Sequence, residues 1–245
     1  NREAESNLRV SRYLKDFLLK CKAKVIMTRD SDKFVSLKAR PTMAKLYGAD
    51  IFISIHHNWT PRYTAQAATI WYHLTPDHNP ASIDLSRYIF QEVTNKVEMK
   101  EMDKAMGLKA DNLIYDIGFS VLRNLDSSIA GTLCELAFFS NLETELKMRN
   151  SEFLKQEAYG IFLGIARYIY AGIPHYKVIS PENQEIKEKK PKFTIRIFDG
   201  LESRKEWGWK RTKIFARHLV VELDGKKTHF KYNRSKGILT FTPVH

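Results

Sequence analysis

The run Ala49-Asp50-Ile51-Phe52-Ile53-Ser54-Ile55-His56-His57-Asn58-Trp59 is the centre of the chain. Its apolar, β-branched first part predicts a buried strand. Two imidazoles and an amide follow directly, at the end of a strand where α/β folds usually bind ligands and metals. A single His there is more simply a capped or solvated side chain, but a His-His-Asn cluster favours a site.

The elements around this run alternate between strand and helix. Further strands are predicted at residues 24–29, 67–73 and 121–124. Helices are predicted between them, opened by Ser36 and by Asn79, and again over residues 153–173. A strand, a crossover helix and a second strand make the unit of a parallel sheet. Residues 1–174 are therefore expected to form an α/β domain, a mostly parallel sheet with helices on both faces.

A carboxylate lies at the start of the first predicted helix. Apolar residues recur with helical spacing from Val10 to Leu18, which is typical of an amphipathic helix packed on a sheet. Extended backward through Asn7, this stripe reaches Glu3, whose side chain then faces the core. A negative charge near a helix N-terminus is also stabilising by ~0.3–1 kcal/mol, and the residues alone favour that structural interpretation.

One charge, Glu135, interrupts the apolar run from Ile129 to Phe139. An unpaired buried carboxylate is costly, so it shifts its pKa or pairs with a cation. A buried salt bridge to Arg40 or Arg123 is the structural alternative. We favour the functional one, a general base or acid tuned by burial and a nearby cation.

The composition changes after residue 174. Residues 175–192, rich in Lys, Glu and Pro, predict a linker. Residues 193–245 alternate with period two and contain the turn sequences Asp224-Gly225 and Ser235-Lys236-Gly237, which predicts a small all-β module. Its Trp207 and Trp209 either fill the module's core, which is favoured, or stack on sugar rings.

The amino-acid composition and the net charge exclude several classes of protein. Hydrophobic residues make up 43% of the 245 residues, which excludes a disordered chain, and no apolar run is long enough to cross a bilayer. The net charge of +12 favours anionic partners, namely nucleic acid, acidic lipid or the anionic polymers of a bacterial wall. No nucleic-acid-binding signature is present, so nucleic acid is not an expected partner. Cys21 and Cys134 are expected to be core residues.

Three segments, in order and with their spacing, resemble the zinc-dependent N-acetylmuramoyl-L-alanine amidases that cut bacterial cell walls. They are Thr28-Arg29 with Asp32, Leu37 and Arg40, then residues 49–58, then residues 133–141. The resemblance covers about residues 3–171. It implies a sheet flanked by helices and hydrolysis of the amide bond between the lactyl group of N-acetylmuramic acid and L-alanine in peptidoglycan.

The resemblance also implies the site residues. His56 is similar to a zinc ligand of the family, Glu3 in the Glu-x-x-x-Asn-Leu pattern to a second, and Glu135 to the catalytic glutamate. A catalytic Zn²⁺ takes three protein ligands and leaves a position for water, whose pKa it lowers to ~7. Glu135 would take the proton of that water and pass it to the leaving amine, while Asn58 orients His56 or the substrate.

Two features depart from the family pattern. The first zinc ligand of the family, a His within Asp-Pro-Gly-His-Gly-Gly, has no counterpart here. Either an upstream strand is lacking from the sequence, which we favour because the sheet would otherwise expose an edge, or the chain is a degenerate relative. His57 stands where the family has a small residue, and strand alternation predicts that it faces away from His56.

The sequence therefore predicts a zinc amidase of the bacterial cell envelope, periplasmic or secreted, that acts on peptidoglycan. Anionic wall polymers or an activator protein are the other expected partners. The alternative is a non-catalytic peptidoglycan-binding or regulatory relative that keeps the fold without zinc.

Overall fold

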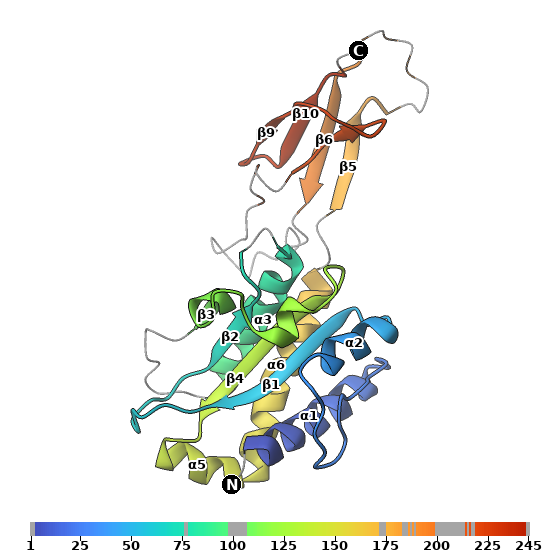
Figure 1. Ribbon diagram of the computed structural model, residues 1–245. Coiled ribbons are helices and arrows are strands. Elements are labelled where there is room, and N and C mark those ends of the chain that lie inside the picture. The colour runs from blue at the N-terminus through green and yellow to red at the C-terminus, as the bar shows by residue number, and fades with distance from the viewer. Residues whose placement is uncertain are drawn as a thin grey trace. The chain divides into compact units, whose positions relative to one another are not determined.

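A computed structural model of the chain describes residues 3–75, 78–97, 107–171, 175–182, 186, 188, 190–198, 214, 216 and 219–243 (Figure 1). The chain divides into two compact units, Asn1–Tyr168 and Ile169–His245. Among the described helices, none combines the length and the apolar character that a membrane span requires.

The first unit is built on a four-stranded sheet with the strand order β1-β4-β2-β3. Its strands are β1 (Ile51–Asn58), β2 (Thr69–Tyr72), β3 (Leu108–Ala110) and β4 (Ala130–Phe138). β1 pairs with β4, and β2 with β3, in parallel, whereas β2 and β4 run antiparallel. The predicted α/β class is confirmed, and the antiparallel pairing makes the sheet mixed.

Helices cover both faces of this sheet (Figure 1). The main core joins the sheet to the apolar faces of α1 (Glu3–Lys20), α3 (Pro80–Lys96) and α6 (Ser151–Ala171). On the other face a smaller cluster joins Phe52, Trp71 and Leu133 to α4 (Ser120–Arg123), with Ala44 of α2 (Ala39–Leu46) packed against it. Successive side chains of the strands therefore point into two apolar layers, one on each face of the sheet, as the buried runs of the sequence predict.

Helix starts follow the predicted capping chemistry in part. Asn79 accepts a hydrogen bond from the Ser82 N–H at 3.1 Å and caps α3. In the same way Asn141 caps α5 (Leu142–Arg149). The predicted cap at Ser36 is displaced, because α2 begins only at Ala39, whose N–H donates to the Ser36 hydroxyl.

Two predicted strands are wrong. Residues 24–29 form an irregular segment along α1, since the described sheet ends at β1 and offers this segment no ladder partner. Residues 121–123 belong instead to the single-turn helix α4, which Asn124 follows, and this helix places the adjacent side chains of Val121 and Leu122 in one apolar cluster. A short apolar run has no periodicity that separates helix from strand.

The second unit holds an antiparallel sheet with the order β5-β6-β10-β9. These strands are β5 (His175–Ser180), β6 (Phe193–Phe198), β10 (Ile238–Phe241) and β9 (Lys231–Asn233), and Asp224-Gly225 joins the hairpin β7 (Glu222–Leu223) and β8 (Lys226–Lys227). β5 corrects the predicted linker, because residues 175–180 pair with β6 as an edge strand of this sheet. Trp207 and Trp209 lie outside the described residues.

Candidate active site

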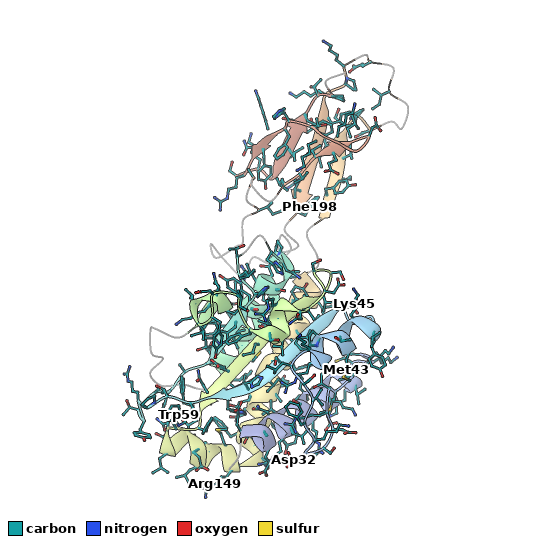
Figure 2. All side chains as sticks on the ribbon, in the orientation of Figure 1. Asp32, Met43, Lys45, Trp59, Arg149 and Phe198 are labelled. Atoms are coloured by element: carbon teal, nitrogen blue, oxygen red, sulfur yellow. The ribbon has the colours of Figure 1, made fainter. Side chains whose placement is uncertain are left out.

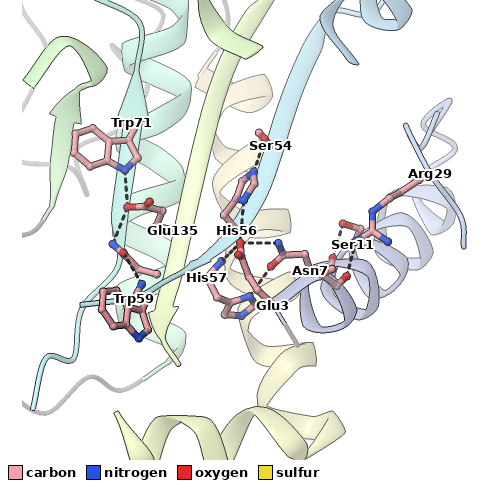
Figure 3. Close-up of polar contacts among 12 residues, drawn as sticks. Glu3, Asn7, Ser11, Arg29, Ser54, His56, His57, Trp59, Trp71 and Glu135 are labelled. Atoms are coloured by element: carbon pink, nitrogen blue, oxygen red, sulfur yellow. Dashed lines mark hydrogen bonds and ion pairs between the residues drawn. The ribbon is translucent and has the colours of Figure 1, made fainter. Parts of the chain in front are cut away.

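The site forms where β1 and β4 run side by side. Their parallel register pairs His56 with Glu135, so both side chains lie on the same face of the sheet (Figure 3). Phe52 and Leu133 precede them on that face and are buried beneath α4. The polar residues thus follow directly after the apolar cluster, and Trp59 just beyond β1 is exposed (Figure 2).

Glu3 and His56 come together from α1 and β1. Glu3 Oε1 lies 3.0 Å from His56 Nδ1 and also accepts a hydrogen bond from Asn7 Nδ2 at 3.1 Å (Figure 3). Burial alone would raise the pKa of Glu3, but hydrogen bonds with His56 and Asn7 outweigh it and lower that pKa to about 2. Both side chains are partly exposed, at 37% and 32%. The Glu3 side chain, which was predicted to face the core, thus forms a specific pair with His56.

Glu135 is held by one of its two carboxylate oxygens. Its Oε2 accepts hydrogen bonds from Asn58 Nδ2 at 2.8 Å and from Trp71 Nε1 at 2.9 Å (Figure 3). No described residue donates to its Oε1, and this oxygen is not among the fully buried side-chain atoms. Burial raises the pKa of Glu135, an effect that Trp71 and His56 oppose. The carboxylate is therefore fixed in place, and its second oxygen receives no hydrogen bond from a described residue.

In the described structure, neither Arg40 nor Arg123 forms the alternative salt bridge with Glu135. The Arg40 guanidinium donates to the Val35 carbonyl, and Arg123 donates to the carbonyls of Ile117 and Gly118. Asn58, which sequence analysis placed near His56 or the substrate, instead contacts Glu135. Trp71 had no predicted role, and nothing in its strand context distinguishes it from a core residue.

His57 faces the opposite side of β1, as strand alternation predicts. Its Nδ1 lies 2.7 Å from Asn7 Oδ1 and its Nε2 lies 3.1 Å from Glu157 Oε2, with the His57 and Glu157 side chains fully buried. Asn7 therefore joins this buried pair to Glu3. Glu157 was not predicted, because it follows Lys155 and Gln156 in a helix whose local sequence does not distinguish it from an exposed acid.

The two donor atoms that Glu3 and His56 bring together suit a zinc ion. Two donors ~2.0–2.1 Å from a tetrahedral zinc lie roughly 3.3 Å apart, close to the 3.0 Å between Glu3 Oε1 and His56 Nδ1. Carboxylate and imidazole are also donors that zinc accepts. Within the described part of the chain, no three His, Cys, Asp or Glu side chains gather as a metal cluster. Glu3 and His56 are thus two candidate donors of the three usual in a catalytic site.

Comparison with known proteins agrees with this geometry. Residues 1–167 match the family model described as N-acetylmuramoyl-L-alanine amidase. The curated amidase AmiC of Escherichia coli is 28% identical over 204 residues, a match that covers 70% of this chain and 48% of AmiC. The chain thus spans about half the length of that relative.

Solved structures of amidases are similar to the first unit. An N-acetylmuramoyl-L-alanine amidase of Clostridium difficile 630 matches with a TM-score of 0.59 at 27% identity, covering 69% of this chain and 84% of that one. The catalytic domain of CwlV from Bacillus (Paenibacillus) polymyxa matches with a TM-score of 0.59 at 25% identity, covering 69% and 86%. Because the family model matches residues 1–167, which is more than half of this chain, the chain belongs to the N-acetylmuramoyl-L-alanine amidase family.

Proposed function

We propose that this chain hydrolyses the amide bond between N-acetylmuramic acid and the L-alanine of the peptidoglycan stem peptide. The observation that carries this proposal is the arrangement of Glu135 beside His56 on one face of the sheet, with Glu3 of α1 in contact with His56. Family membership supports the same reaction.

Glu135 is the proposed proton-transfer group. Its Oε1 is open to an attacking water, while Trp71 and Asn58 fix Oε2 and so the direction of the carboxylate. Glu135 takes a proton from the water while the water oxygen bonds to the scissile carbonyl carbon. When the carbon–nitrogen bond breaks, Glu135 returns that proton to the L-alanine amine. The raised pKa of Glu135 suits it for both steps.

Glu3 and His56 are the proposed zinc ligands. A zinc ion bound there would supply a Lewis acid that polarises the scissile carbonyl and lowers the pKa of a water molecule. Asn7 donates to Glu3 and also contacts His57, so the buried residues behind β1 fix the orientation of the Glu3 carboxylate. Ser54, within 3.2 Å of His56 Nε2, does the same for the imidazole.

The proposed partners and the proposed cellular location rest on the charge of the second unit and on family membership. The second unit has roughly two basic residues for each acidic one, and we propose that it binds anionic wall polymers. An activator protein is a second proposed partner, since the similar CwlD amidase of Clostridioides difficile was solved in complex with the GerS lipoprotein. Both proposals place the protein in the bacterial cell envelope, in the periplasm or outside the cell.

Digestion of purified peptidoglycan tests the proposed reaction. The chain, supplied with Zn²⁺, is expected to release peptides with a new L-alanine amino terminus and to create no new reducing sugar ends. A Glu135→Gln variant is the matched inactive control. New reducing ends would instead show cleavage of the glycan, and a chain that retains no zinc and shows no turnover would support the non-catalytic alternative.

A further inference from the structure

Trp59, the residue directly after β1, is exposed although the backbone around it is fixed. The residue is 56% exposed (Figure 2). Its N–H donates to Asn58 Oδ1 at 2.7 Å, and the next N–H, that of Thr60, donates to Ser140 Oγ at 3.2 Å. The Asn58 carbonyl accepts a hydrogen bond from the Phe139 N–H at 3.0 Å. The residues on both sides of Trp59 are therefore hydrogen-bonded to the segment that follows β4.

Asn58 joins Trp59 to the proposed proton-transfer group. The Asn58 Nδ2 donates to Glu135 Oε2 at 2.8 Å, while its Oδ1 accepts from the Trp59 N–H. Trp71 donates to the same oxygen of Glu135, and Figure 3 shows the two tryptophans on opposite sides of Glu135. Trp71 is buried and holds the carboxylate, whereas Trp59 is open to solvent. A substrate whose scissile bond lies at Glu135 therefore has Trp59 beside its neighbouring groups.

The indole of Trp59 offers a large apolar surface to a ligand. Within the residues that the structure describes, no aromatic ring or cationic side chain packs on it. A fully covered aromatic side chain buries about 150–250 Å², and apolar burial is favourable in proportion to its area. Single exposed apolar side chains are common on protein surfaces. This one differs because one hydrogen-bonded residue, Asn58, links it to Glu135.

We propose that the indole of Trp59 stacks on the pyranose ring of N-acetylmuramic acid. The inference rests on the proposed function, because it takes the glycan side of that substrate as the ligand. One face of a pyranose ring presents C–H groups, which pack on the negative face of an aromatic ring. The other side of the scissile bond carries L-alanine, whose methyl group is too small to cover an indole. Stacking on Trp59 holds the sugar in register while Glu135 acts on the amide bond.

Two soluble ligands that differ only in the sugar test this contact. One is an N-acetylmuramoyl dipeptide, and the other is the lactyl dipeptide, which has the same amide bond without the sugar ring. Their affinities are measured with Zn²⁺ present in a Glu135→Gln background, so that neither compound is hydrolysed. The muramoyl compound should bind about tenfold tighter, the gain expected from covering ~55 Å² of apolar surface. Trp59→Ala should abolish this difference, and Trp59→Phe should retain part of it.

Tyr47→Ala is the matched control, because Tyr47 is 54% exposed and precedes β1, at the end of the strand away from Glu135. It should leave the difference between the two compounds unchanged. Thermal melts should show the same melting temperature for Trp59→Ala as for its parent, because the indole is exposed. If Trp59→Ala weakens both compounds equally, Trp59 does not contact the sugar and the proposal is wrong. A parent protein that binds both compounds equally, or binds neither, would likewise overturn it.

The digestion experiment separates this inference from the proposed function. A chain that digests peptidoglycan but shows no sugar-dependent affinity keeps the function and loses the stacking contact. A chain that shows the affinity difference, and loses it in Trp59→Ala, without digestion keeps the contact and loses the function.

Discussion

Two glutamate–histidine pairs lie on opposite sides of the end of β1, formed by adjacent histidines of the sequence. Glu3 and His56 are 3.0 Å apart and partly exposed, whereas Glu157 and His57 are 3.1 Å apart and fully buried. The same two residue types thus occur in one open and one closed pair. Access to water and substrate, rather than residue type, separates a candidate metal site from a structural contact.

The two pairs are joined through Asn7, which contacts Glu3 with its amide nitrogen and His57 with its oxygen. The closed pair is costly to assemble because both groups lose their hydration, and Glu157 Oε1 is buried with no hydrogen-bond partner in the described structure. We infer that the closed pair supports the open one. The open side should then control activity and the closed side stability.

The largest expected effect lies on the open side. Glu135→Gln should lower turnover by about 10²–10⁴-fold, the usual contribution of general acid–base catalysis. It should also raise the melting temperature at neutral pH, because a carboxyl whose pKa is raised by folding destabilises the folded state once it ionises. Peptide release and thermal melts of the same samples check both results. A fall in both quantities would make Glu135 a structural residue.

Breaking the closed pair should mainly affect stability. Glu157→Ala leaves the buried His57 Nε2 without its partner, and we expect a loss of about 3–5 kcal/mol in the free energy of unfolding, measured with urea. Glu152→Ala on the same helix is the control, since Glu152 is exposed and contacts Lys155, and it should change stability by less than about 0.5 kcal/mol. Equal effects of the two changes would remove the distinction between the pairs.

The smallest expected effect is a pH dependence of the open pair. The pKa of Glu3 is lowered to about 2 in the folded chain, so its ionised form stabilises the fold at pH values above its ordinary pKa of ~4.3. That contribution should be lost as the pH falls from there toward 2, and exposure limits it to about 1 kcal/mol or less. Melts of wild type and Glu3→Gln should therefore converge over this range. Curves that stay parallel down to pH 2 would show that the contact contributes nothing.

Sequence patterns predicted the open side better than the closed one. The lone charge of Glu135 in an apolar strand and the His-His-Asn end of β1 are local signals, and the register of β1 and β4 brings them together. Glu157 was missed because its partner lies 100 residues away. Residues 24–29 were misassigned because a strand depends on a neighbour that local sequence does not reveal.

The roles assigned to the open side are tested most directly by zinc binding to three proteins: the wild-type chain, His56→Ala and Glu135→Gln. Each is titrated with Zn²⁺ against a chromogenic chelator, and its bound zinc is confirmed by elemental analysis. We expect zinc to bind the wild type and Glu135→Gln alike and to be lost from His56→Ala, with peptidoglycan digestion lost in both variants. Equal zinc binding by all three proteins, or equal loss in both variants, would contradict the division between a metal ligand and a proton-transfer residue.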